Sequence, residues 1–270
     1  MKIAFVVAST NHGTLIINRN DENENQEYGR YGVGSQLFET GGFYPSDTDL
    51  LTSILRIRKR AFANQRPIVA VDCGANIGVH TLEFARELQS EGRVLAIEAQ
   101  RAIFYALCGN IAINNCFNVE ARNIAVGAAD GFLNVPFIDY HTRSSFGSLE
   151  LREREGKEYI GQAVDYTTGY DVPLMTLDSL CKDQIDLIKI DVEGMEEEVI
   201  SGAIELLKRS RPVLFVERIK GDFFPIEAVL KSLDYELVDL GPNVLAVSNA
   251  DPTKVEVMRM VANLTTCLPR

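Results

Sequence analysis

The run VDCGANIG at Val71–Gly78 constrains the fold of this chain more than any other segment. The apolar residues PIVAV that lead into Asp72 are typical of a buried strand. Gly74 allows a left-handed backbone or the close approach of a ligand, and Gly78 allows the next helix to pack close to the strand. We therefore predict a strand, a tight turn and a helix from Val79, with Asp72 at the edge where open α/β sheets bind their ligands.

The spacing of this turn distinguishes its ligand from a dinucleotide. A dinucleotide site needs the pattern G-x-G-x-x-G, but Asn76 occupies the place of the middle glycine. A pyrophosphate requires bare amides and positive charge, whereas Asn76 and Asp72 suit a ligand with an ammonium group and hydroxyls. S-adenosylmethionine is such a ligand. The next predicted strand ends in Glu98, about twenty residues after the turn, where a carboxylate can accept both ribose hydroxyls.

From residue 67 onward, strand and helix patterns alternate, which predicts a mostly parallel sheet with helices on both faces. The predicted strands after the turn cover residues 94–98, 119–124, 131–138, 186–191 and 212–217, followed by an antiparallel pair at 235–239 and 243–248. The predicted helices cover residues 49–63, 79–88, 103–114, 193–207 and 225–233.

The length of 270 residues and the hydrophobic content of 46% are enough for one large α/β domain with an N-terminal extension. We expect residues 1–65 to form this extension, residues 66–250 the ligand-binding domain, and residues 251–270 a C-terminal tail. In the extension, apolar runs at 3–8 and 14–18 predict a β-hairpin and the polar residues 20–30 predict a loop. The extension and an insertion at 131–172 are rich in loops, so we expect them to determine specificity.

Composition excludes several other classes of function. The formal net charge of −11 opposes general binding of a polyanion, so we expect no nucleic-acid partner. Five cysteines without a C-x-x-C pair argue against a disulfide framework and a structural zinc site, and they favour a reduced, cytoplasmic location. No run approaches the roughly eighteen apolar residues that a membrane span requires, so we expect no membrane partner.

A second group of acids follows a neighbouring strand. Asp191 and Glu193 lie at the carboxyl end of the strand at 186–191, and Glu217 ends the strand after it. Carboxylates that converge at one sheet edge repel one another and raise one another's pKa. This repulsion is costly, and a functional role can explain why the acids are placed together. Period-two alternation puts Lys189 on the same strand face as Asp191. The catalytic candidates are therefore Asp191, Glu193, Lys189 and Glu217.

Each of these candidates also has a structural interpretation. Lys189 could be a core lysine paired with Glu217 or Asp191, and Glu193 could favour a helix N-terminus through the macrodipole. Asp191 could instead accept the proton of a substrate hydroxyl as a general base. A bound divalent ion is a third interpretation, because oxygen ligands suit magnesium or calcium, although we assign no metal ligand. Among the histidines, we expect His80 to be a surface or packing residue, whereas His141 in the insertion could reach a substrate.

Several motifs resemble those of the FkbM-type S-adenosylmethionine-dependent methyltransferases. They are the turn VDCGANIGVHTL, the strand end AIEA, and the segments VGSQLFETGGFYPSDT, NIAVG, PLMTLDSL and DLIKIDVEGMEEEVISGA. Together they span roughly residues 33–248. The presence of both the glycine turn and KIDVEG in one chain is more specific for this family than either motif alone.

This resemblance implies a Rossmann-like class I methyltransferase fold, with a mostly parallel seven-stranded sheet, a C-terminal antiparallel hairpin and an N-terminal hairpin and helix extension. It implies S-adenosylmethionine as cofactor and O-methylation of a hydroxyl on a sugar, glycan or other small-molecule acceptor. By motif match, the methionine part would contact Asp72, Gly74, Asn76 and Gly78, the ribose Glu98, and the adenine Asn123 and Ala125, while Ala75, Ala99 and Asp191 complete the cofactor site.

One residue departs from the family pattern. Met195 follows the glycine of the second motif, where the family often has histidine. If that histidine matters to the chemistry, this chain must use another base or rely on proximity alone. Two alternatives therefore remain beside the enzyme. One is a protein that binds S-adenosylmethionine without turnover, and the other, disfavoured by Asn76, is an NAD-dependent oxidoreductase.

Overall fold

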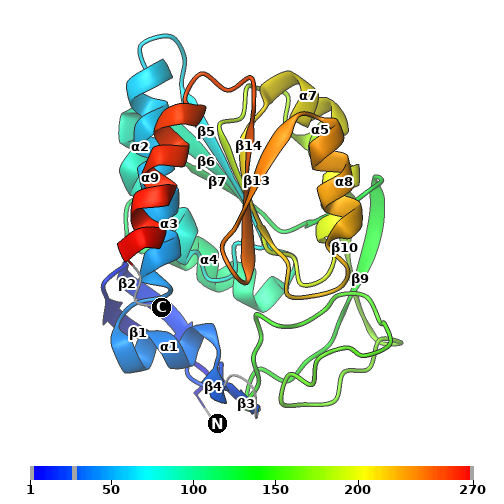
Figure 1. Cartoon of the computed structure of the whole chain (residues 1–270). Coiled ribbons are helices and arrows are strands. Elements are labelled where there is room, and N and C mark those ends of the chain that lie inside the picture. The colour runs from blue at the N-terminus through cyan, green and yellow to red at the C-terminus, as the bar shows by residue number, and fades with distance from the viewer. Residues whose placement is uncertain (1–2, 26–28, 268–270) are drawn as a thin grey trace.

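A seven-stranded sheet forms the centre of the protein (Figure 1). The computed structural model describes residues 3–25 and 29–267. The sheet strands are β5 (Ile68–Cys73), β6 (Gly92–Ile97), β7 (Val119–Arg122), β11 (Leu187–Ile190), β12 (Val213–Glu217), β13 (Tyr235–Asp239) and β14 (Asn243–Ser248). Their order is β13-β14-β12-β11-β5-β6-β7, with β14 antiparallel to both its neighbours and all other pairs parallel. This confirms the predicted mostly parallel sheet with a closing antiparallel pair.

Helices cover both faces of this sheet. One face carries α2 (Pro45–Phe62), α3 (Val79–Leu88), α4 (Arg101–Ile113) and α9 (Lys254–Cys267), and the other carries α5 (Leu177–Leu180), α6 (Glu196–Ser201), α7 (Ile204–Ser210) and α8 (Phe224–Ser232). Strand alternation explains the two cores. Ile68 and Ala70 of β5 face the first group of helices, whereas Val69 and Val71 face the second. A short 3₁₀ turn, η1 (Gln89–Glu91), joins α3 to β6.

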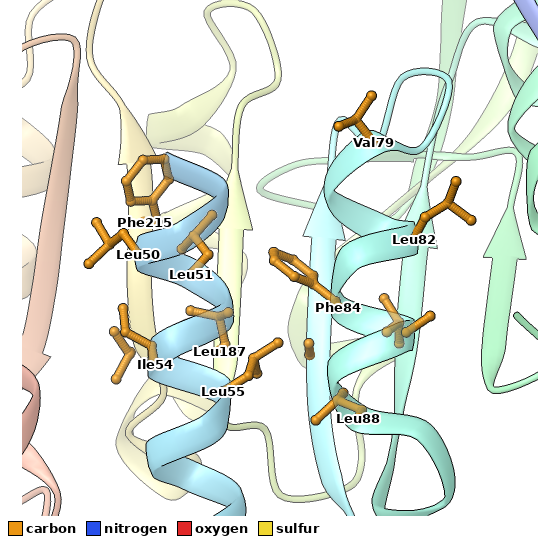
Figure 2. Close-up of a cluster of buried hydrophobic side chains, with 14 of the residues drawn as sticks. Leu50, Leu51, Ile54, Leu55, Val79, Leu82, Phe84, Leu88, Leu187 and Phe215 are labelled. Carbon is orange, nitrogen blue, oxygen red and sulfur yellow. The ribbon is translucent and has the colours of Figure 1, made fainter. Parts of the chain in front are cut away.

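The first core joins the N-terminal part of the chain to the sheet (Figure 2). The buried side chains labelled in Figure 2 come from α2, α3, β11 and β12, and they are Leu50, Leu51, Ile54, Leu55, Val79, Leu82, Phe84, Leu88, Leu187 and Phe215. Helix α9 adds Val257 and Val261 to the same core, so the segment after residue 250 contains a packed helix. Helix α2 therefore cannot move away from the sheet without exposing this core.

The extension before α2 contains more regular structure than the sequence predicts. The expected hairpin is present as β1 (Phe5–Thr10) and β2 (Gly13–Asn18). Where a loop was predicted, the short strands β3 (Asn23–Asn25) and β4 (Gly29–Tyr31) pair, and α1 (Val33–Thr40) follows them. Asn110 of α4 connects the hairpin to the turn after β5. Its side chain accepts a hydrogen bond from the Ile16 N–H at 2.5 Å and donates one to the Ile77 carbonyl at 2.8 Å.

The insertion forms a second, small sheet. Its strands are β8 (Ala125–Val126), β10 (Gly169–Met175) and β9 (Gly131–Pro136), in that order. Residues 137–168 contain no helix or strand. The buried Asp21 links them to the extension, since its carboxylate accepts the N–H groups of Gly34 and Phe146, each at 3.0 Å.

The predicted helix at 193–207 is wrong as a single element. Glu193 and Gly194 have φ of 56° and 95°, so α6 begins only at Glu196. Gly202 then separates α6 from α7, and a Cβ at this position would lie 2.1 Å from the Gly127 carbonyl oxygen. The close approach of two distant segments interrupts the helix, which local periodicity cannot reveal.

Asp186, just before β11, is a buried centre of charge. It is fully buried, and its carboxylate accepts hydrogen bonds from both terminal nitrogens of Arg66 at 2.7 Å, from Arg58 Nε at 3.2 Å and from the Val69 N–H at 2.9 Å. Arg58 is itself 3% exposed and also pairs with Asp251. This cluster ties α2, β5, β11 and the start of α9 together.

Replacing Asp186 with asparagine should destabilise the protein by about 3 kcal/mol, because the arginines would lose a shared buried counter-charge. Urea unfolding followed by circular dichroism measures this loss. Asp183→Asn is the matched control: its side chain is 65% exposed, and its surface ion pair with Arg93 contributes little. Equal unfolding midpoints for the two variants would contradict the role given to Asp186.

Candidate active site

A cavity of about 630 Å³ opens at the carboxyl ends of β5, β6 and β11. It lies where β6 and β11 diverge on opposite sides of β5, the switch point at which open α/β sheets bind ligands. Residues from the glycine turn, the extension and the insertion also form its wall. We call the residues that line this cavity the cavity wall.

The glycine turn brings bare backbone into the cavity wall. Gly74 has φ of 76°, and a Cβ on it would lie 1.7 Å from the Asp191 carbonyl oxygen. The N–H groups of Gly74 and Ala75 both donate to the Ile97 carbonyl, at 3.0 and 2.8 Å. The tight turn thus requires glycine, and it holds the ends of β5, β6 and β11 together. Gly78, with φ of 95°, starts α3 but lies outside the cavity wall.

Glu98 is held in the cavity wall by two backbone groups. Its Oε2 accepts the Asn76 N–H at 2.9 Å and its Oε1 accepts the Gln100 N–H at 2.7 Å. Burial raises the pKa of Glu98 to about 7, although these hydrogen bonds lower it. Since a carboxylate oxygen has two lone pairs, each oxygen retains an acceptor site for a ligand hydroxyl.

Lys189 pairs with two acids on the same sheet face. Its Nζ lies 3.0 Å from Asp191 Oδ2 and 3.5 Å from Asp72 Oδ1. Burial by itself lowers the pKa of Lys189, but Asp191 and Asp72 together raise it above its usual value. The pairing expected between Lys189 and Asp191 is therefore present, and it fixes one oxygen of Asp191 at the edge of the cavity.

Asp72 and Asn123 lie behind the cavity wall. Asp72 is fully buried, and its Oδ2 accepts the Thr81 hydroxyl at 2.6 Å. Asn123 donates from Nδ2 to the carbonyls of Glu98 and Ala99, at 2.8 and 3.0 Å. Neither side chain lines the cavity, in which the motifs suggested contacts with the methionine part and the adenine. Asp72 instead supports Lys189 and α3, and Asn123 supports the loop that carries Glu98.

An apolar part of the cavity wall lies beside Glu98. Ala99, Ala125 and Met195 are buried in one hydrophobic cluster and all line the cavity. Met195, where the family often has histidine, is 3% exposed and adds apolar surface. This part of the cavity suits a flat, weakly polar ring.

Three acids converge in the cavity after β11 and β12, on the other side of β5 from Glu98. Carboxylate oxygens of Asp191, Glu193 and Glu217 lie within 4.8 Å of one another. Burial raises the pKa of Glu217 to about 10 and that of Glu193 to about 8, and neighbouring acids add to both shifts. Lys220 pairs with Glu193, while Glu217 Oε2 is buried without a hydrogen-bond partner among the described residues. This end favours a ligand that supplies positive charge or hydroxyl donors, and its oxygens are also close enough to surround a divalent cation.

The structure decides between the two roles expected for His80. It is 8% exposed and packs against Phe43 and Phe84, so it is a packing residue rather than a surface residue, and it also belongs to the cavity wall. Its place in the first turn of α3, two residues after Gly78, is the signal that could have found it. His141 is exposed and lies outside the cavity wall.

The extension and the insertion complete the cavity wall. Tyr31 and Tyr44 come from the extension, and Ser145 and Glu158 come from the insertion. The Tyr31 hydroxyl donates to Glu158 Oε1 at 2.5 Å, so these two segments meet at the cavity. No sequence motif identified Tyr31, Ser145 or Glu158, and Tyr44 lies in the segment VGSQLFETGGFYPSDT, to which the sequence assigned no site residue.

The sheet order, the glycine turn and the acids at neighbouring strand ends define a Rossmann-like fold of the class I methyltransferase type. A family model described as the methyltransferase FkbM domain matches residues 72–237. The chain therefore belongs to the FkbM methyltransferase family, as its motifs indicate.

Two fungal proteins are similar in sequence. Methyltransferase sdnD of Sordaria araneosa is 28% identical in an alignment 156 residues long that covers 50% of this chain and 60% of that protein. Methyltransferase 1 of Beauveria bassiana (strain ARSEF 2860) is 26% identical in an alignment 174 residues long that covers 60% of this chain and 70% of that protein. This chain thus matches less than two thirds of the length of the Sordaria protein.

The crystal structure of methyltransferase FkbM from Methylobacillus flagellatus KT is also similar, with 16% identity and a TM-score of 0.49 over 67% of this chain and 43% of that one. Among the helices in the described part of this chain, none combines the length and apolar character needed to cross a membrane.

Proposed function

We propose that this protein transfers a methyl group from S-adenosylmethionine to a hydroxyl group of a sugar, glycan or small natural product. The observation that carries this proposal is one continuous cavity wall, with the Glu98 carboxylate beside an apolar surface at one end and the acids after β11 and β12 at the other. Family membership implies S-adenosylmethionine as the methyl donor.

The residues present fit this cofactor. Glu98 would accept the ribose hydroxyls, and the surface of Ala99, Ala125 and Met195 would cover the adenine. The glycine turn leaves Ala75 and Asn76 in the cavity wall for the remainder of the molecule. When bound, the sulfonium supplies an electrophilic methyl group and a positive charge, which the acidic end of the cavity favours.

The proposed chemistry of the chain is positioning and proton acceptance. Methyl transfer from a sulfonium needs little covalent assistance, so holding the acceptor oxygen in line with the methyl group supplies much of the rate. Asp191 would take the hydroxyl proton on Oδ1, while Lys189 holds Oδ2 at 3.0 Å. Glu193 and Glu217 would accept hydrogen bonds from other hydroxyls of the acceptor.

The first experiment measures ligand binding and then turnover. Calorimetric titration of the purified protein should show binding of S-adenosylmethionine and S-adenosylhomocysteine but not of NAD⁺, and S-adenosylhomocysteine should form with a hydroxylated acceptor from a panel of sugars, glycans and polyketides. A preference for NAD⁺ would support an oxidoreductase. Binding without methyl transfer to any acceptor would support a non-catalytic protein. A short RNA in the panel tests the expectation that nucleic acid is not a substrate.

Glu158 provides a test of the acceptor end of the cavity. Its carboxylate accepts the Tyr31 hydroxyl and lies 3.2 Å from Lys220 Nζ. Glu158→Gln should raise the KM for the acceptor by about tenfold, the effect of one charge-assisted hydrogen bond, with little change in the Kd for S-adenosylmethionine. Steady-state kinetics and calorimetry separate the two effects.

Glu153→Gln is the matched control, because Glu153 belongs to the same insertion but lies outside the cavity wall. If Glu158→Gln weakened the cofactor and left the acceptor KM unchanged, the acceptor would have to bind elsewhere.

A further inference from the structure

His80 presents a buried ring nitrogen that lacks a partner. Its side chain packs between Phe43 and Phe84, with ring centroids 6.0 and 6.1 Å away. The residue is 8% exposed, and its Nε2 is buried without a hydrogen-bond partner among the described residues. A buried polar atom left unpaired destabilises the fold, and His80 lines the cavity, so a ligand bound there is the natural source of the missing partner.

The charge state of His80 makes it a neutral donor. Burial lowers the pKa of His80 to about 3, and the nearby positive charge of Lys189 lowers it further, while Asp191 opposes this shift. The imidazole is therefore uncharged near neutral pH, and one ring nitrogen carries a hydrogen. Such a ring can donate a hydrogen bond without the cost of a buried charge.

The position of His80 indicates which part of a ligand it meets. Glu98 follows β6, whereas His80 lies across the glycine turn, in the first turn of α3. The ten-residue α3 has its N-terminus here, and its free N–H groups and macrodipole favour a negative group. If the ribose is at Glu98, the amino-acid end of the cofactor extends across the turn toward α3, and its carboxylate is the anionic group of that end.

We propose that Nε2 of His80 donates a hydrogen bond to the carboxylate of the amino-acid end of S-adenosylmethionine. This inference rests on the proposed function and assigns a further cofactor-binding residue within the same cavity. It predicts that His80 distinguishes ligands with the amino-acid end from ligands without it.

Two product-like ligands test the proposal by calorimetry. S-adenosylhomocysteine carries the amino-acid end, and 5′-methylthioadenosine has the same adenosyl thioether without it. His80→Phe should weaken S-adenosylhomocysteine about 10-fold to 100-fold, the effect of one hydrogen bond to a charged group, and leave 5′-methylthioadenosine nearly unchanged. His80→Gln retains a donor and should recover much of the lost affinity. His141→Phe, which alters an exposed ring outside the cavity wall, should change neither ligand.

The outcomes separate this inference from the proposed function. Equal weakening of both ligands by His80→Phe, or no weakening of either, would overturn the role of His80 while the cofactor assignment stands. Failure of the unaltered protein to bind either ligand would overturn the proposed function itself.

A second measurement avoids variants that fail to fold. In the unaltered protein labelled with ¹⁵N-histidine, the His80 Nε2 resonance should shift with S-adenosylhomocysteine and not with 5′-methylthioadenosine. The sequence has three histidines, so His12 and His141 variants assign the signal. A shift of equal size with both ligands would contradict the proposal.

Discussion

Replacement of Asp191 with asparagine is expected to lower turnover by about 10²-fold to 10⁴-fold, the usual contribution of a positioned general base. Asp191 belongs to the cavity wall, and Lys189 holds one of its oxygens at 3.0 Å. The amide of asparagine can keep a contact with Lys189 but cannot accept the hydroxyl proton. Asp72 remains 3.5 Å from Lys189, so the buried lysine keeps a counter-charge and the fold should persist.

Two readouts distinguish this role from a structural one. Single-turnover kinetics should show the loss in the chemical step, while calorimetry should show little change in affinity for S-adenosylhomocysteine. Asp183→Asn, in the exposed loop before β11, should retain wild-type kinetics. Full turnover by Asp191→Asn with normal cofactor affinity would exclude Asp191 as the base and leave proximity as the main source of rate.

Replacement of Glu98 with alanine should weaken S-adenosylmethionine by 100-fold or more, because roughly 3–6 kcal/mol is expected from two hydrogen bonds to an ionised carboxylate. The two backbone N–H groups that hold Glu98 orient both oxygens before the ligand arrives. Unchanged affinity of Glu98→Ala in a calorimetric titration would show that the ribose is not bound here. Glu98→Gln, which keeps one acceptor oxygen, should give an intermediate loss.

The same residue should make cofactor binding depend on pH. Burial raises the pKa of Glu98 to about 7, and only the ionised carboxylate offers both oxygens as acceptors to the two ribose hydroxyls, because protonation turns one oxygen into a donor. Affinity should therefore fall about tenfold from pH 8 to pH 6, since most of the carboxyl groups are protonated at pH 6. In Glu98→Gln this dependence should disappear, and its persistence would assign the titration to another group.

Ionisation of Glu98 favours cofactor binding, but it lowers the stability of the fold when no ligand is bound. Because the folded-state pKa is raised, Glu98 stabilises the fold at pH values below its unfolded pKa, and this contribution is lost as the pH rises through about 7. Bound cofactor offsets the cost of ionisation, so the ligand-induced rise in Tm should be larger at pH 8 than at pH 6.

Local patterns in the chain were sufficient for the sheet and for part of the site. Short apolar runs that alternate with helical patterns predicted the strands. The carboxyl ends of parallel strands lie at one edge of a sheet, so the acids at the ends of β6, β11 and β12 lie at that edge. The sequence also indicated that Gly74 adopts a left-handed backbone or closely approaches a ligand, and the structure shows a left-handed φ and a close approach to the Asp191 backbone. Period-two spacing placed Lys189 on the same strand face as Asp191, and the structure shows that Asp191, rather than Glu217, is its partner of the two that the sequence left open.

The tertiary structure decided which side chains reach the cavity. Asn123 has the spacing of a ligand residue but turns toward the backbone of Glu98, whereas His80 is buried by Phe43, which comes from a distant segment. Tyr31 and Glu158 meet where contacts such as that of Asp21 with the Phe146 N–H join the extension to the insertion. Periodicity reports which face of a strand or helix is apolar, but contacts between distant segments depend on how whole elements pack, and no local pattern encodes them.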